Sequence, residues 1–214
     1  MRKGAFITFE GIDGCGKSTQ LELAAKRLSE QSFPIMVTRE PGGTAIAEKI
    51  REILISPLNS EMVNECELLM YLAARAQHVR EKIIPAIEQG FVVLCDRFQE
   101  ATFAYQGFGR NIPLDFLEKI NSFATGGLSP DLTFVFDISV DLSNERMQKM
   151  NKAKDRLELN GRTFYQKIAE GYRFLAKKEP QRILLLDGSE PLERISEQVY
   201  CKIKDILKNH LSPA

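Results

Sequence analysis

The sequence predicts an α/β fold in which helices cover both faces of a five-stranded parallel sheet, and two observations carry this prediction. Five short apolar stretches, rich in Val, Ile, Leu and Phe, lie at residues 5–9, 35–38, 91–95, 132–137 and 182–186. Longer stretches in which apolar residues recur with helical spacing separate them. Strands that are apolar on both faces and alternate with helices are typical of parallel sheets covered on both sides.

The expected helices follow from the same periodicity. They span residues 16–32, 44–55, 64–89, 114–124, 139–150, 163–178 and 192–211. Pro85 lacks the backbone N–H that a helix interior needs, so we expect a kink or a break there. The chain has 214 residues and shows no internal repeat or low-complexity linker, which indicates a single domain over residues 1–214.

The composition narrows the class of protein. Twenty-nine basic and 29 acidic residues give a formal net charge of zero, so we expect no nucleic-acid partner. The apolar stretch near Met1 is too short for a secretion signal, and no run approaches about 18 apolar residues. We therefore expect a cytoplasmic protein without a membrane partner. The scattered cysteines are expected to be reduced: Cys15, Cys66, Cys95 and Cys201.

The most specific local motif is GIDGCGKS at residues 11–18, which matches G-x-x-x-x-G-K-[ST]. It follows a predicted strand and opens a predicted helix, where backbone N–H groups and the helix N-terminus bind phosphate. This context predicts a fold of the P-loop NTPase type. Lys17 is expected to reach the β- and γ-phosphates, and Ser18, with Asp96, to hold Mg²⁺. The expected ATP-binding residues are Gly11, Ile12, Asp13, Gly14, Cys15, Gly16, Lys17, Ser18 and Thr19.

Further candidate residues follow the predicted strands, where ligands of open α/β sheets bind. Arg39 begins the string REPGGT after the second strand. Tyr71 and Arg75 are four residues apart on one helix face, where they could stack on a base and donate to its carbonyl. Arg97 follows the third strand, and an arginine there suits an anionic substrate better than a hydrolytic water. A basic stretch at residues 149–160 is a candidate lid beside the triphosphate.

Together these motifs resemble the thymidylate kinases of the bacterial type. The phosphate loop, REPGGT, the Tyr71–Arg75 helix, DRF with AYQG, PDLTFVFD and DRLE keep the family's order over essentially the whole chain. The resemblance implies a lid at about residues 147–160 and, usually, a homodimer. It also implies transfer of the γ-phosphoryl group of ATP, with Mg²⁺, to thymidine 5′-monophosphate (dTMP), which gives dTDP for dTTP synthesis.

The resemblance also implies roles for single residues. Arg39 and Arg97 match positions that bind the 5′-phosphate of dTMP, and Asp13 matches a carboxylate near that phosphate. Tyr71 matches the ring that stacks on thymine, and Arg75 matches the residue that meets a thymine carbonyl. Three further residues complete the expected dTMP site. Thr102 matches a polar residue at the base edge, Tyr105 matches a ring that disfavours ribonucleotides, and Gln106 follows Tyr105.

The resemblance places part of the catalytic charge in the lid. Position 14 is Gly, where another branch of the family has an arginine in the phosphate loop. The lid must then supply the cation at the γ-phosphate, and Lys152, Arg146 and Arg156 are the alternatives. With these three, the expected catalytic residues are Asp13, Lys17 and Arg97. No histidine lies in a motif, and we expect a structural role for His78.

Two alternative functions stay open at this point. One is a kinase for another nucleoside monophosphate or for a deoxynucleoside, because only the resemblance points to thymine. The other is a nucleotide-binding switch module that signals without catalysis. The absence of a guanine-reading N-K-x-D string and the arginines on the acceptor side disfavour the switch.

Overall fold

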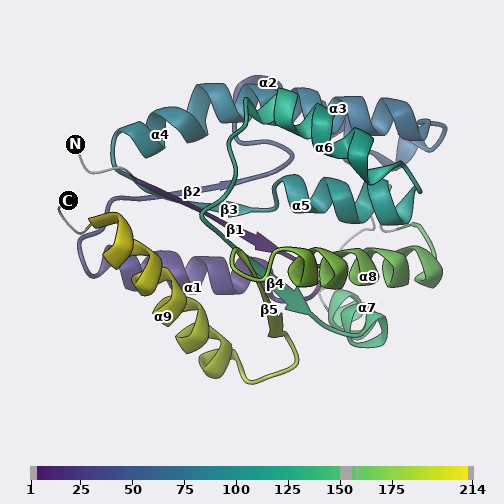
Figure 1. Cartoon of the computed structure of the whole chain (residues 1–214). Coiled ribbons are helices and arrows are strands. Elements are labelled where there is room, and N and C mark those ends of the chain that lie inside the picture. The colour runs from purple at the N-terminus through teal and green to yellow at the C-terminus, as the bar shows by residue number, and fades with distance from the viewer. Residues whose placement is uncertain (1–3, 150–155, 158, 212–214) are drawn as a thin grey trace.

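The computed structural model describes residues 4–149, 156–157 and 159–211, and at its centre lies a parallel sheet (Figure 1). The five strands lie in the order β2-β3-β1-β4-β5, and every pairing is parallel, which confirms the predicted fold class. The strands are β1 (Ala5–Glu10), β2 (Ile35–Arg39), β3 (Val92–Asp96), β4 (Leu132–Asp137) and β5 (Ile183–Asp187).

Helices cover both faces of this sheet. In Figure 1, α2, α3, α4 and α6 lie on one side of it, whereas α1 and α9 lie on the other. The α-helices are α1 (Lys17–Ser29), α2 (Ala45–Ile55), α3 (Asn64–His78), α4 (Ile84–Glu88), α5 (Gln99–Thr102), α6 (Leu114–Thr125), α7 (Val140–Lys149), α8 (Arg162–Lys178) and α9 (Leu192–Leu211). Shorter turns are the 3-10 helix η1 (Pro57–Asn59) and the π-helices η2 (Val79–Ile83) and η3 (Phe103–Gly109).

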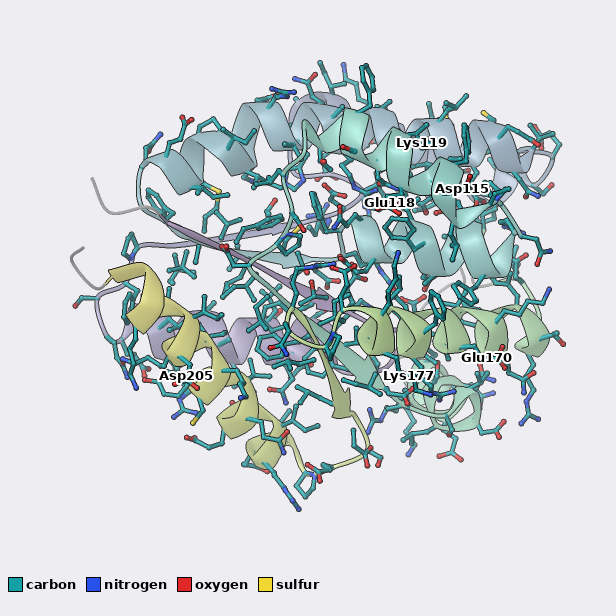
Figure 2. All side chains as sticks on the ribbon, viewed as in Figure 1. Asp115, Glu118, Lys119, Glu170, Lys177 and Asp205 are labelled. Carbon is teal, nitrogen blue, oxygen red and sulfur yellow. The ribbon has the colours of Figure 1, made fainter. Side chains whose placement is uncertain are left out.

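The side chains of β1 show how the two faces form separate cores. Successive residues of a strand point to opposite faces. Ile7 and Phe9 pack into the larger core, to which α1, α8 and α9 contribute, whereas Phe6 packs with Val79 and Val93 on the opposite face. All six residues of β1 are buried, as expected for the central strand of a covered sheet. Many charged side chains lie on the outside of the molecule, for example those of Glu170, Lys177 and Asp205 (Figure 2).

The structure differs from the predicted elements at two places. The chain stays helical to Glu88, and a π-helical stretch before Pro85 replaces the expected break. A widened turn can absorb the missing N–H of a proline. Residues 99–109 are helical as α5 and η3, although their sequence suggested no element. Within the described residues, none of the helices is long and apolar enough to cross a membrane.

Candidate active site

The phosphate loop, residues 11–18, connects β1 to α1. Gly14 and Gly16 have φ angles of 73° and 93°, a left-handed region that residues with a Cβ rarely adopt. Gly16 is the N-cap of α1, so the chain turns sharply and leaves the helix N-terminus open to an anion. Lys17 is 7% exposed, and its Nζ lies 3.4 Å from Asp13 Oδ1.

Oxygen atoms that suit Mg²⁺ meet beside this loop. Ser18 Oγ donates to Asp96 Oδ2 at 2.5 Å, across the neighbouring strands β1 and β3. Hydroxyl and carboxylate oxygens are hard ligands, and Mg²⁺ is commonly held by one or two such groups together with substrate phosphates. In the part of the chain that the structure describes, no cluster of three or more His, Cys, Asp or Glu side chains forms a self-contained metal site. The pair therefore fits an ion that arrives with a triphosphate.

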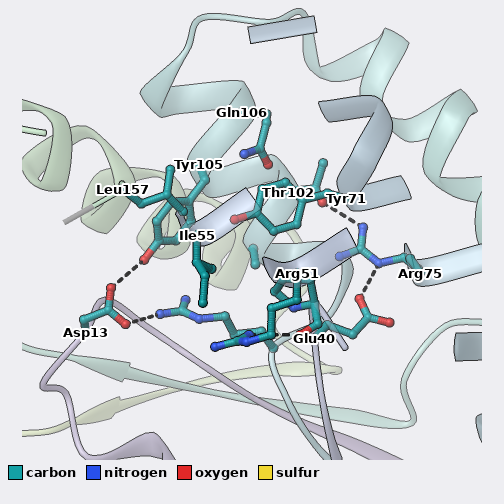
Figure 3. Close-up of a pocket in the computed structure, with 13 residues that line it drawn as sticks. Asp13, Glu40, Arg51, Ile55, Tyr71, Arg75, Thr102, Tyr105, Gln106 and Leu157 are labelled. Atoms are coloured by element: carbon teal, nitrogen blue, oxygen red, sulfur yellow. Dashed lines mark hydrogen bonds and ion pairs between the residues drawn. The ribbon is translucent and has the colours of Figure 1, made fainter. Parts of the chain in front are cut away.

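A cavity of about 130 Å³ lies next to the loop (Figure 3). It opens beyond the carboxyl ends of β1 and β3, where ligands of open α/β sheets bind. Figure 3 shows Asp13 on one wall and Arg75 on the opposite wall. Seven of the residues that the sequence assigned to the acceptor line this cavity: Asp13, Tyr71, Arg75, Arg97, Thr102, Tyr105 and Gln106.

Arg97 brings a positive charge to the end of the cavity nearest the phosphate loop. Its Nη2 donates to Asp13 Oδ1 at 2.6 Å, and its Nη1 donates to the carbonyl of Gly11 at 2.9 Å. Burial raises the pKa of Asp13, but the charges of Arg97 and Lys17 outweigh it and hold that pKa well below its ordinary value. Asp13 is therefore an ionised carboxylate between two cations.

Arg75 lies at the other end of the cavity and is only 2% exposed. Its Nε donates to Glu40 Oε2 at 2.7 Å, and its Nη2 donates to the carbonyl of Phe98 at 2.7 Å. Its Nη1 donates to Thr102 Oγ1 at 2.7 Å and to Asn121 Oδ1 at 2.6 Å. A guanidinium has five N–H donors. Four are engaged here, and the described residues provide no acceptor for the fifth, on Nη2.

Glu40, which pairs with Arg75, has a second partner, His78, that also favours its anionic form. The Nδ1 atom of His78 lies 3.0 Å from Glu40 Oε1, and its Nε2 lies 2.7 Å from Thr38 Oγ1. Burial raises the pKa of Glu40, but the interactions with Arg75 and His78 lower it by a larger amount. The pKa of Glu40 therefore lies below its ordinary value. His78 is fully buried and does not line the cavity, so its role is structural, as expected.

A second groove, of about 400 Å³, lies on the other side of the phosphate loop. Its walls come from the loop, from α7 and from the segment after β5, including Gly188 and Leu192. Arg146 on α7 joins the two sides. Its Nη1 donates to the carbonyl of Gly14 at 3.2 Å, and its Nη2 donates to the carbonyl of Gly188 at 3.1 Å.

Comparison with known proteins tests the expected family. The family model described as "Thymidylate kinase" matches residues 9–199. The chain belongs to the thymidylate kinase family. It is 43% identical to the thymidylate kinase of Pelotomaculum thermopropionicum, over 96% of this chain and 95% of that one. It is 44% identical to that of Geobacter sulfurreducens, over 97% and 98%, and 48% identical to that of Geotalea daltonii, over 86% and 89%.

Two residues predicted for the thymidylate kinase site, Arg39 and Arg156, do not line the cavity. Arg39 ends β2 with its side chain 52% exposed, and its Nη2 lies 2.8 Å from Glu48 Oε2. Arg156 is 6% exposed, and its Nε donates to the carbonyl of Leu54 at 2.9 Å. Lys152 lies outside the described residues.

Arg156 belongs instead to a buried charge cluster around Glu67 of α3. The Oε2 atom of Glu67 lies 2.7 Å from Arg156 Nη2 and 3.2 Å from Arg110 Nη2. Its Oε1 accepts a hydrogen bond from Gln106 Nε2 at 2.9 Å. Burial raises the pKa of Glu67, but its hydrogen bonds and the arginine charges lower it below the ordinary value. Because Leu157 lines the cavity, this cluster lies next to the cavity, at one end of the segment that is expected to form the lid.

Sequence reasoning missed several lining residues, and Arg51 is the most important of them. Arg51 lies on α2 and donates through Nη1 to the carbonyl of Pro41 at 2.9 Å. Its position contained a usable signal, because it follows Thr44, the N-cap of α2, by about two helical turns. Two turns bring a side chain back to the side of the helix that faces the REPGGT turn. Ile55 and Leu157 carried no such signal.

We expect Glu67→Ala to lower the free energy of unfolding by about 3–5 kcal/mol, because Arg110 and Arg156 would lose the counter-charge that their burial requires. Glu65→Ala is the matched control, since Glu65 is exposed in the first turn of the same helix, and it should cost less than about 1 kcal/mol. Urea denaturation of both variants measures the difference. Equal, small losses would show that the cluster contributes nothing to stability.

Proposed function

We propose that the protein transfers the γ-phosphoryl group of ATP to dTMP, giving ADP and dTDP. One observation carries this proposal: the phosphate loop and the acceptor cavity share a residue. Asp13 belongs to the loop, lines the cavity and lies 2.6 Å from Arg97. A donor phosphate on the loop and an acceptor phosphate on Arg97 would therefore be neighbours. Membership of the thymidylate kinase family supports thymidylate as the acceptor.

The acceptor phosphate is proposed to lie between Arg97 and Arg51. Both guanidinium groups line the cavity, and each is held by a backbone carbonyl, those of Gly11 and Pro41. Arginines bind phosphate through paired N–H donors and are permanently charged. Arg39 pairs with Glu48 outside the cavity, so its predicted phosphate contact would require its side chain to leave that partner.

The thymine base is proposed to lie between Tyr71 and Arg75 at the other end. Tyr71 supplies a ring for stacking, and the remaining N–H of Arg75 donates to a base carbonyl. An N–H donor cannot pair with an amino group, so a contact at C4 of the base, where thymine has a carbonyl and cytosine has an amino group, favours thymine over cytosine. Thr102 holds Arg75 in place. The ring of Tyr105 is buried and its hydroxyl donates to Asp13 Oδ2 at 3.5 Å, and we propose that this ring excludes a ribose hydroxyl.

ATP is proposed to bind through the backbone of the phosphate loop and Lys17. Ser18 and Asp96 would hold Mg²⁺, which when bound neutralises charge on the transferred phosphoryl group. Arg146 lies in the second groove between two loops, so we assign it to the nucleoside end of ATP rather than to the γ-phosphate. Lys152 then remains the proposed lid cation.

The reaction needs no general base, because the attacking oxygen of a monophosphate is already ionised. Its main obstacle is the approach of two anions in line. Positioning and neutralisation of charge therefore supply the catalysis. Lys17 Nζ and Arg97 Nη2 both contact Asp13 Oδ1, at 3.4 and 2.6 Å, and we propose that each of these cations meets one of the two phosphates.

Lys17→Ala should lower kcat by at least about 10³-fold, since it removes a cation from the transferred group. Lys26→Ala, an exposed change on the same helix, should leave kcat unchanged. An ADP-release assay with ATP, Mg²⁺ and separate nucleoside acceptors measures both. Release with dTMP but not with dCMP, AMP or thymidine is expected. Release with another acceptor alone would indicate a different kinase, and ATP binding without release would indicate a switch.

Arg75→Ala should raise the KM for dTMP by about tenfold or more and lower kcat less, because the base contact lies away from the reacting phosphates. Arg75→Lys keeps a positive charge beside Glu40 but loses the planar set of N–H donors of the guanidinium. If this variant stays folded, its KM for dTMP should also rise by more than its kcat falls. Arg80→Ala, an exposed change nearby, is the control. An unchanged KM for dTMP in both Arg75 variants would refute the base-reading role.

The protein is also proposed to form a homodimer through the outer face of α2, α3 and α6. These helices lie together on one side of the sheet in Figure 1. Large apolar side chains are exposed on all three, and that of Phe123 is 88% exposed. An apolar patch of this kind commonly marks a protein interface. The patch consists of Ile46, Ile53, Leu69, Phe116 and Phe123.

Phe123→Asp should shift the protein from dimer to monomer, because a two-fold symmetric interface contains the substituted residue of both subunits. Phe174→Asp is the control, since Phe174 is also exposed but lies on α8, outside the patch. Sedimentation velocity measures the masses. A wild-type monomer, or a dimer that persists in Phe123→Asp, would contradict this interface.

A further inference from the structure

Arg97 has an unusual backbone for a residue with a long side chain. Its φ is 69°, in the left-handed region that disfavours residues with a Cβ. Its N–H donates to the carbonyl of Phe9 at 3.0 Å, so the turn after β3 is fixed on one side by β1. A second contact must hold the other side of the turn, because the backbone of a left-handed residue without such support would leave this φ region.

Glu10, the last residue of β1, supplies this second support. It is fully buried, and its Oε1 accepts the backbone N–H of Phe98 at 2.7 Å. Phe98 is the residue directly after Arg97, so the peptide units on both sides of Arg97 are bound to β1. The carboxyl group of Glu10 thus holds the backbone conformation that directs Arg97 into the cavity.

The other oxygen of Glu10 reaches the side chain of Arg97 through Tyr172 of α8. The hydroxyl of Tyr172 donates to Glu10 Oε2 at 2.8 Å. The same hydroxyl oxygen lies 3.3 Å from Arg97 Nη1, which donates to it. The donors therefore run in one direction, from Arg97 to Tyr172 to Glu10. On its remaining side the guanidinium lies 5.1 Å from the centroid of the Tyr105 ring.

From these contacts we infer that Glu10 and Tyr172 are positioning residues for the phosphoryl transfer, which they serve by orienting Arg97. The inference rests on the proposed function, since Arg97 is there the contact to the acceptor phosphate. Neither residue lines the acceptor cavity, so their effect on the reaction passes through Arg97. The local sequence does not indicate this role, because Glu10 is the last residue of an apolar strand and Tyr172 lies in a helix far along the chain.

The surroundings of Glu10 allow its role as a hydrogen-bond acceptor to be tested by a conservative substitution. Burial and the negative charge of Glu100 raise the pKa of Glu10 to about 8, against the lowering effect of Arg97 and Tyr172. A neutral amide is therefore tolerable in size and charge. The amide of Glu10→Gln keeps one acceptor oxygen but presents an NH₂ group at its second position, so it cannot accept both the Phe98 N–H and the Tyr172 hydroxyl.

A double-variant experiment tests the inference on the full-length protein. Tyr172→Phe should lower kcat/KM for dTMP by about tenfold, the scale of one lost hydrogen bond, and leave the KM for ATP within about twofold. Arg97→Lys should lower kcat/KM by about 100-fold. Because Tyr172 acts through Arg97, the double variant should be no slower than Arg97→Lys alone. Glu10→Gln should behave like Tyr172→Phe.

The control is Thr8→Val, which removes a buried hydroxyl from the same strand as Glu10. Among the described residues, the hydrogen-bond partner of Thr8 Oγ1 is Thr133 Oγ1 inside the sheet, at 2.8 Å, so this change should lower Tm but not kcat/KM. Multiplicative losses in the double variant, or unchanged kinetics in both Tyr172→Phe and Glu10→Gln, would overturn the inference. If the wild type phosphorylates dTMP, such a result leaves the proposed function intact. A wild type that does not phosphorylate dTMP refutes the function itself.

Discussion

The active site depends first on the register in which β1 pairs with β3. Phe9 lies opposite Asp96, and the two strands run in the same direction. The loop after β1 and the turn after β3 therefore leave the sheet side by side. This brings Ser18 within 2.5 Å of Asp96 and Asp13 within 2.6 Å of Arg97, although each pair is about 80 residues apart. A slip of two residues would move the strands by about 7 Å and break both contacts.

Buried charges then give direction to the side chains around the cavity. An ion pair such as Arg75 with Glu40 costs desolvation energy, and apolar residues in its place are often equally stable. Stability alone therefore does not explain it. What the burial provides is orientation: with four of five donors engaged, Arg75 presents its last N–H in one direction only. The exposed Arg39 has no comparable restraint.

The strands and many of the residues that line the cavity could be predicted from sequence where a local pattern decides the structure. The stretch LTFVFD is β4 at the predicted residues, because its apolar side chains fit a buried parallel strand. Residues 99–109 were assigned no element from the sequence. They are helical since the segment packs on α8, where a Cβ at Gly109 would lie 2.7 Å from Phe164. This packing is invisible to local propensity.

The same limit explains why single residues of the site were harder to assign than its motifs. A basic stretch near residue 156 reads as a solvated lid, and nothing local shows that Arg156 is buried. Its place is decided by Glu67, which lies on α3 far along the chain and pairs with it at 2.7 Å. Arg51 instead enters the cavity through a short-range contact, because the backbone carbonyl of Pro41, ten residues earlier in the chain, holds it there.

Asp13 explains how two cations can lie close together at this site. Lys17 and Arg97 would repel each other, and the carboxylate that both of them contact offsets that repulsion. Charges that are held in fixed positions are the arrangement that electrostatic catalysis requires. This has a consequence for Arg97. In the proposed reaction a substrate phosphate competes with Asp13 for the guanidinium of Arg97, and the carboxylate then no longer fixes the direction of that guanidinium alone. The contacts to Tyr172 and to the Gly11 carbonyl are then the ones that keep it aimed at the phosphate.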